Sequence, residues 1–189
     1  MNIKIILILV FSYLYVFFEI LMSRIGRRNK TIEKSSDKGS IWVLIIAIFI
    51  GYTISSRLAA SSTGRLAPWN TYFAIGSVLI LIGLYIRISS ILALKQQFTY
   101  TVTKMENHEL IVTGWYRYIR HPGYLGQLII FLGIATAMSN WLSVAGMMLP
   151  VLAGFIYRIR VEEKFMREQM GQKYLDYQKR TSRLIPKIY

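Results

Sequence analysis

Long apolar runs alternate with short blocks rich in Lys and Arg along this chain. A helix needs about twenty apolar residues to cross a bilayer, because each residue adds about 1.5 Å along the helix axis. The last of the apolar runs, 124–157, is 34 residues long, which is too long for one span. Ser139-Asn140 near its middle predicts a turn, and hence a tight hairpin of two helices. The three runs before it predict one span each, at residues 3–22, 41–58 and 72–94.

The composition indicates a membrane protein. Hydrophobic residues make up 54% of the chain, more than an ordinary soluble domain contains. The first apolar run could be mistaken for a removable secretory leader. However, it is about twenty residues long, lacks a small-residue cleavage site and is followed by Arg24, Arg27 and Arg28. We therefore expect a retained span.

The net charge of +14 is concentrated in the segments between the apolar runs. Nucleic-acid binding is one interpretation of such basicity, but these residues lie beside the spans, where anionic lipid headgroups would meet them. Nineteen basic residues lie in segments 23–40, 95–123 and 158–189, whereas the other side has only Lys4, Arg57 and Arg65. The positive-inside rule then places the N-terminus outside, and the C-terminus and both large loops in the cytoplasm. The expected partner is the lipid bilayer, not nucleic acid.

The whole chain is expected to form one all-α integral membrane domain with about five transmembrane helices. The tail is amphipathic near helical spacing; Gly171 interrupts it and Pro186 ends it. It therefore predicts a cytoplasmic helical cap across the mouths of the spans. Pro150 predicts a kink in the second helix of the hairpin. The expected parts are three spans in 1–94, a cytoplasmic loop in 95–123, the hairpin in 124–157 and the tail in 158–189.

The residues that the sequence lacks exclude several kinds of chemistry. There is no Cys, which rules out disulfides, thiolate catalysis and Cys-based metal sites. The two histidines, His108 and His121, are thirteen residues apart, and this argues against a metal site. No Gly-rich phosphate loop, Ser nucleophile motif or His-x-x-x-His spacing occurs.

Arg158 and Glu162 lie four residues apart, so a helix would place both on one face. They could form an ordinary interfacial ion pair in which Arg158 snorkels at the end of a span. Acids are unexpected at a membrane face rich in cations, however, and both Glu162 and Glu163 stand there. A charged pair at the end of a span is therefore a candidate site.

Arg120-His121-Pro122-Gly123 directly precedes the hairpin. Pro122 suits the first turn of a helix and marks where the fourth span begins. His121 would then lie at a helix N-terminus, where free backbone N–H groups attract anions. Gly123 leaves room for either a ligand or a neighbouring helix, and spacing alone does not decide between them. The nearby aromatic residues, Tyr116 and Tyr124 among them, also suit an aromatic belt at the headgroup level.

From about residue 83 to the end, the chain closely resembles the isoprenylcysteine carboxyl methyltransferases and their prokaryotic relatives. Residues 1–82 match only as apolar spans. The matching pieces are Phe98-Thr99, His108-Glu-Leu-Ile-Val-Thr-x-Gly-Trp-Tyr-Arg, Arg120-His-Pro-Gly-Tyr-Leu-Gly, Asn140-Trp, Arg158-x-x-x-Glu162-Glu163, Gly171-x-x-Tyr174-x-x-Tyr177 and Arg183-Leu-Ile-Pro186.

The resemblance implies a membrane-embedded fold of five or so helices with a cytoplasmic pocket for S-adenosylmethionine. Arg158 matches the arginine that engages the substrate in that family, and we expect catalytic roles for Arg158 and Glu162. A family cofactor position near Thr101 lacks its polar amide here and is left out. The implied contacts to S-adenosylmethionine are His108, Glu109, Leu110, Ile111, Tyr116, His121, Pro122, Gly123, Tyr124 and Glu162.

The expected function is methyl transfer from S-adenosylmethionine to a lipophilic, membrane-borne acceptor in a prokaryotic cell membrane. A prenylcysteine-like carboxylate or another lipid acid suits this site best, because a carboxylate is already ionised at neutral pH and needs no general base. A lipid hydroxyl and a phospholipid amine remain alternatives, although an amine needs a base that Arg158 does not provide. Two further classes are a nicotinamide-dependent reductase of the sterol reductase type and a non-catalytic membrane protein.

Overall fold

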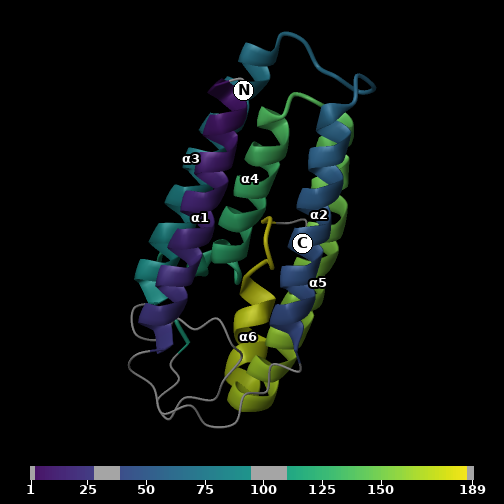
Figure 1. Cartoon of the computed structure of the whole chain (residues 1–189). Helices are drawn as coiled ribbons and strands as arrows, with labels where there is room; N and C mark the ends of the chain where they lie inside the picture. Colours follow the sequence, from purple (N-terminus) through teal and green to yellow (C-terminus); the bar gives the residue numbers. More distant parts are fainter. Residues whose placement is uncertain (1–2, 28–38, 95–109, 187–189) are drawn as a thin grey trace.

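The computed structural model describes residues 3–27, 39–94 and 110–186 as an elongated bundle of helices (Figure 1). In this part of the chain the β-structure consists of two isolated bridges, Arg65 with Asn140 and Ile119 with Ser182. The helices are α1 (Ile3–Arg27), α2 (Ser40–Ala60), α3 (Trp69–Leu94), the short 3₁₀ helix η2 (Gly114–Arg117), α4 (Pro122–Ala137), α5 (Trp141–Met170) and α6 (Gln172–Arg180).

The prediction of an all-α integral membrane fold is confirmed. Among the described residues, α2, α3 and α5 are long and apolar enough to cross a bilayer, while α4 and Val10–Met22 of α1 are shorter apolar stretches. Large apolar side chains such as Phe49, Leu81 and Leu149 point outward, at 72%, 63% and 70% exposure. Such a surface is stable against lipid rather than against water.

Glycines allow α3 and α4 to pack with their backbones in close approach. Gly76 and Gly83 on α3 lie seven residues apart and face Gly133 and Gly126 on antiparallel α4. A Cβ at Gly76 would lie 2.5 Å from the Gly133 carbonyl oxygen, and a Cβ at Gly83 would lie 2.7 Å from that of Gly126. Small residues at helix contacts are the usual means of tight packing within a membrane.

The second helix pair, α2 with α5, packs in the same manner. A Cβ at Gly51 of α2 would lie 2.9 Å from the Met147 carbonyl oxygen, and one at Gly154 of α5 would lie 2.8 Å from Ala47 Cβ. In Figure 1 the α2–α5 pair stands on one side of the bundle and α3 and α4 on the other, with α1 beside α4. The start of α4 and the last turns of α5 therefore meet at the α6 end.

The hairpin between α4 and α5 turns at the predicted residues. Ser139 adopts a positive φ of 56°, and the Oδ1 of Asn140 caps α5 by accepting hydrogen bonds from the backbone N–H groups of Leu142 and Ser143 at 2.9 and 3.2 Å. Its Nδ2 donates to the Thr63 carbonyl at 2.8 Å. The hairpin was predicted to end at residue 157, whereas α5 continues to Met170 with Pro150 inside it, so the expected tail begins as part of the same helix.

The predicted break at Gly171 separates α5 from α6. Gly171 adopts a φ of 54°, a conformation that favours glycine, and α6 follows at once. Tyr174 and Tyr177 form the buried face of α6, whose helix ends at Arg180, before the expected stop at Pro186. The amphipathic tail thus covers one end of the bundle, as its pattern predicts.

Replacing Gly83 by Ala tests the close approach of α3 and α4. The added methyl group would meet backbone atoms of α4, which cannot move aside cheaply, so we expect a loss of about 1–3 kcal/mol in the free energy of unfolding. Val78→Leu on the outward face of α3 is the control, because Val78 is 55% exposed. Unfolding in detergent measures both variants; equal stability of the two would contradict the packing described.

Candidate active site

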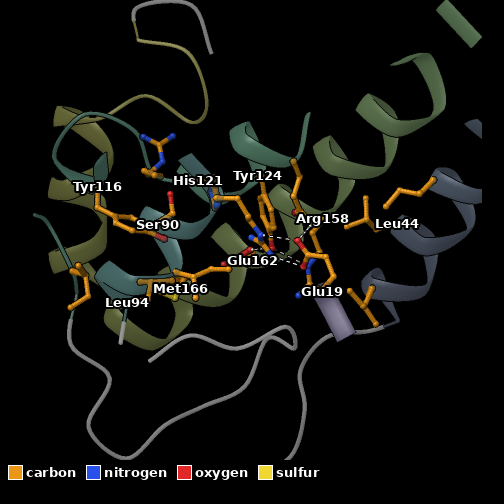
Figure 2. A pocket seen from close by; sticks show the side chains of 18 of the residues that line it. Glu19, Leu44, Ser90, Leu94, Tyr116, His121, Tyr124, Arg158, Glu162 and Met166 are labelled. Atoms are coloured by element: carbon orange, nitrogen blue, oxygen red, sulfur yellow. Dashed lines mark hydrogen bonds and ion pairs between the residues drawn. The ribbon is translucent and has the colours of Figure 1, made fainter. Parts of the chain in front are cut away.

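A cavity of about 540 Å³ is lined by side chains from all six helices α1 to α6. We call the part near α6 the outer part and the part among the apolar helices the inner part. Figure 2 shows Tyr116 and Met166 toward one side, Leu44 toward the other, and Tyr124 and Glu162 between them. The outer part is lined by Leu110, Ile111, Tyr116, Met166, Tyr174 and Tyr177. The inner part is lined mainly by Val16, Ile20, Ile41, Leu44, Ile45, Ile48 and Phe131.

Tyr124 links Arg158 to Glu162 where the two parts of the cavity meet. Arg158 Nε donates a hydrogen bond to the Tyr124 hydroxyl at 3.3 Å, and that hydroxyl donates to Glu162 Oε2 at 2.7 Å. Arg158 is 2% exposed and also donates from Nη1 to Ser40 Oγ. The predicted helical pair is therefore connected through a phenol from α4, which joins α4 to α5 at the level of the site.

His121 places an imidazole beside this junction. Its ring stacks on Tyr124, with the ring centroids 5.5 Å apart and the planes at 8°. Its Nε2 is buried and has no hydrogen-bond partner among the described residues; the nearest carboxylate oxygen, Glu163 Oε1, lies 3.5 Å away. The imidazole therefore lies between Glu163 and the cavity, with its ring stacked on Tyr124 and its Nε2 at ion-pair distance from Glu163.

Glu163 points away from Glu162, because successive residues on a helix differ by about 100° in direction. Its side chain is 1% exposed, and its two oxygens accept hydrogen bonds from Arg120 Nε at 2.8 Å and Arg183 Nε at 3.0 Å. Glu163 thus joins α5 to the segment before α4 and to the segment after α6.

Backbone hydrogen bonds reinforce this three-way junction. Arg120 N donates to the Ser182 carbonyl at 2.8 Å, His121 N donates to the Arg183 carbonyl at 3.0 Å, and Ser182 N donates to Tyr118 O at 3.1 Å. Arg120 Nη1 also donates to the carbonyls of Thr181 and, at 3.2 Å, Gln178. The chain after α6 is therefore fixed against the start of α4, and α6 is held over the outer part of the cavity.

Two buried tyrosines, Tyr174 and Tyr177, and the half-buried Tyr116 give the outer part a polar but uncharged wall. Burial raises the pKa of Tyr177 to about 12 and raises the pKa of Tyr116 and of Tyr174 well above the usual range, with Glu162 and Glu163 adding to the rise for Tyr174. The Tyr177 hydroxyl donates to the Tyr116 carbonyl at 2.7 Å, and Trp115 Nε1 donates to Ser89 Oγ of α3 at 2.9 Å. These contacts fix η2 at the rim, and the phenols remain neutral at physiological pH.

A second charged group lines the cavity on the side of α1. Arg87 of α3 binds both carboxylate oxygens of Glu19 on α1, with Nη2–Oε2 at 2.9 Å and Nε–Oε1 at 3.1 Å. Glu19 and Arg87 each lie within an apolar run of the sequence, but their pairing across 68 residues has no local signature. Other lining residues with no motif are Met166 and the α4 residues Gln127 and Phe131.

Most residues of the predicted site line this one cavity. They are Leu110, Ile111, Tyr116, His121, Gly123, Tyr124, Arg158 and Glu162. Pro122 is not among the lining residues; it is the first residue of α4 and sets where that helix begins. His108, Glu109 and Thr101 lie outside the described residues. No group of three or more potential metal ligands occurs in the described ranges.

The part of the chain that contains most of this site is similar to known proteins. The sequence model of the phospholipid methyltransferase family (PEMT) matches residues 71–173. A probable protein-S-isoprenylcysteine O-methyltransferase from Oryza sativa subsp. indica is 34% identical over 116 residues, which are 60% of this chain and 61% of that protein. Protein-S-isoprenylcysteine O-methyltransferase A from Arabidopsis thaliana is 32% identical over 59% of this chain and 57% of its own length. The Saccharomyces cerevisiae enzyme of the same name is 34% identical over 60% of this chain and 48% of its own.

A solved structure has the same fold. It is the eukaryotic intramembrane Ras methyltransferase ICMT, which aligns with a TM-score of 0.65 and 22% identity over 94% of this chain and 64% of that one. The chain therefore spans less than two thirds of the length of these relatives.

Replacing Glu163 by Gln tests the junction that holds α6 in place. The amide would remove the charge that Arg120 and Arg183 share, and breaking a buried pair in this way destabilises proteins by about 3–5 kcal/mol. Glu168→Gln on the same helix is the control. Glu168 is 57% exposed, and its nearest ion-pair contact, with Lys164, is long at 4.0 Å and contributes little to stability. We expect thermal unfolding in detergent to shift for Glu163→Gln alone; no shift would contradict the role given to Glu163.

Proposed function

The chain belongs to the phospholipid methyltransferase family, and from this premise we propose that it methylates the carboxylate of a lipophilic acid held in the membrane, with S-adenosylmethionine as the methyl donor. One observation carries the proposal. Arg158, Tyr124 and Glu162 stand where a polar outer part and an apolar inner part of one cavity meet. Such a site suits a reaction between a water-soluble molecule and a lipid.

The inner part suits the acceptor because an anchoring charge lies at the end of an apolar passage. Ile41, Leu44 and Ile48 provide surface for a hydrocarbon tail, and Arg158 stands at the polar end. A guanidinium presents paired N–H groups that match the two oxygens of a carboxylate. We therefore assign Arg158 to acceptor binding. The relatives named protein-S-isoprenylcysteine O-methyltransferases support a prenylcysteine-like carboxylate as the acceptor.

The outer part suits S-adenosylmethionine, which would supply an electrophilic methyl group on a positively charged sulfur. Aromatic faces and a carboxylate attract such a cation, and Tyr116 and Glu162 provide both. His121 lines the cavity beside Tyr124, and we assign its ring to the same ligand. Leu110 and Ile111 line the same wall. His108 and Glu109 complete the proposed set from the family resemblance.

The residues of this chain then act by binding and orientation rather than by proton transfer. A carboxylate acceptor has a pKa near 4 and is ionised at neutral pH, so no side chain has to remove a proton. Holding two reactants in line at close range can contribute several kcal/mol to the barrier reduction. Tyr124 contacts both Arg158 and Glu162, and we assign it the role of keeping the acceptor-binding and donor-binding groups in register.

Other functions have less support. A phospholipid amine would need a group to accept its proton, and a permanently charged guanidinium is unsuited to that role. The relatives reported above are named methyltransferases, which favours methyl transfer over nicotinamide-dependent reduction and over a non-catalytic role. We also propose that the outer part faces the cytoplasm, because the basic residues concentrate at that end.

Replacing Arg158 by Ala separates acceptor binding from donor binding. We expect methyl transfer to a lipophilic acid to fall by about 100-fold or more, because the carboxylate loses both its charge partner and its orientation. Binding of labelled S-adenosylmethionine should remain within about twofold, because the donor lies on the other side of Tyr124.

Arg160→Ala is the matched control for this experiment. Arg160 is a basic residue two positions along α5 and is exposed, so its removal should leave both measurements unchanged. Equal loss of donor binding and methyl transfer in Arg158→Ala would show that the two roles are not divided as proposed. Arg158→Lys keeps the charge but not the paired N–H groups, and we expect intermediate activity.

A further inference from the structure

A second charged pair, Arg87 with Glu19, lines the same cavity as Arg158 and Glu162 and joins α3 to α1. Arg87 is 4% exposed and the side chain of Glu19 is 16% exposed. Besides the two contacts from Arg87, Glu19 Oε1 accepts hydrogen bonds from the Tyr15 hydroxyl at 2.8 Å and from Gln127 Nε2 at 3.3 Å. Charged residues at membrane depth are costly, so a pair with this many partners indicates a function.

These contacts connect α1 to two other helices. Arg87 belongs to α3 and Gln127 to α4, whereas Tyr15 and Glu19 lie one turn apart on α1. Among the described side chains of α1, Ile8 and Tyr15 pack in the apolar core at 8% exposure each, whereas Leu14 and Phe17 face outward at 58% and 64% exposure. In lipid, apolar faces gain little by packing on one another, so polar contacts of this kind determine where a helix sits. Glu19 therefore supplies polar contacts that help to fix the position of α1 against α3 and α4.

The helix held in this way forms one side of the inner part of the cavity. Val16 and Ile20 of α1 line the cavity and are also 55% and 48% exposed. Ile45 of α2 lines it as well and is 46% exposed. Residues that face both the cavity and the outside mark an opening, and this opening lies between α1 and α2, on the apolar surface of the bundle. A hydrocarbon tail could pass there without crossing water.

We propose that Glu19 is a positioning residue that fixes α1 as one side of the entrance through which the lipophilic acceptor reaches the cavity. This inference rests on the proposed methyl transfer to a lipid acid. Glu19 precedes residue 71, where the match to the family model begins, so Glu19 itself lies outside the segment that the family model describes. Arg87 lies inside that segment, and its ion pair with Glu19 attaches α1 to the matched part of the chain.

The kinetic test compares Glu19→Gln with the unaltered protein. Loss of the charge weakens the attachment of α1, and we expect the KM for a prenylcysteine analogue in detergent micelles to rise about tenfold, as for the loss of one charged hydrogen bond. The Kd of labelled S-adenosylmethionine should stay within about twofold. Glu19→Asp retains the charge and should bring the KM back to within about threefold of the unaltered value.

Two controls separate this role from a general loss of stability. Ser12→Ala removes another polar side chain of α1, one that bonds only to the Ile8 carbonyl of its own helix in the contacts described, at 2.8 Å, and it should leave the KM unchanged. In the double variant Glu19→Gln with Arg87→Gln, the effect on KM should not exceed that of the stronger single variant, because the two substitutions remove the same ion pair. Additive effects would contradict the pairing.

A distance measurement tests the position of α1 without any reaction. The chain has no cysteine, so Val16→Cys and Ile45→Cys provide two unique sites for spin labels across the opening. We expect one narrow distance distribution with Glu19 present and a broader one in the Glu19→Gln background. Ser12→Ala in the same labelled protein should leave the distribution narrow.

The outcomes separate the two proposals. An unaltered protein that methylates no lipid acid contradicts the proposed function, and the distance measurement then still tests Glu19. An active protein whose acceptor KM and label distances are both unchanged by Glu19→Gln contradicts the role of Glu19. A rise in acceptor KM together with broader distances supports the inference, whereas a parallel loss of donor affinity contradicts it.

Discussion

The hydrogen bonds that join Arg158 to Glu162 through the Tyr124 hydroxyl are the interaction on which the site depends. They bring a cation and a carboxylate of α5 to one phenol of α4, at the place where the apolar and polar parts of the cavity meet. Because the phenol contacts both charged groups, a displacement of α4 relative to α5 would separate whatever each group binds. The remaining architecture can be understood as fixing these two helices.

Three features fix α4 relative to α5. Backbone approach at the glycines lets α4 lie close against α3, so α4 has a defined depth and rotation. Asn140 fixes the other end of the hairpin through its cap and its bond to Thr63. Glu163 joins α5 to Arg120 and Arg183, and thereby holds α6 over the outer part of the cavity. The site thus stands on helices, which position side chains more precisely than loops do.

The sequence predicts those parts of this arrangement that have local causes. Pro122 marks the start of α4, and a turn at Ser139-Asn140 follows from residue types that favour turns. Contacts between residues distant in the chain could not be predicted in this way. Nothing near Glu19 reveals that Arg87 is its partner, because 68 residues separate them. The different directions of Glu162 and Glu163 likewise require the packed helices, since the sequence shows only two adjacent acids.

Identification of the methylated product tests the central claim most directly. The protein would be incubated with isotopically labelled S-adenosylmethionine and a lipid extract, and the labelled lipid analysed by mass spectrometry before and after mild base. The account predicts one additional methyl group on a lipophilic acid and its loss in base, as for a methyl ester. A labelled methyl group on a phospholipid amine would survive the base treatment. That result would contradict the assignment of Arg158 to a carboxylate acceptor.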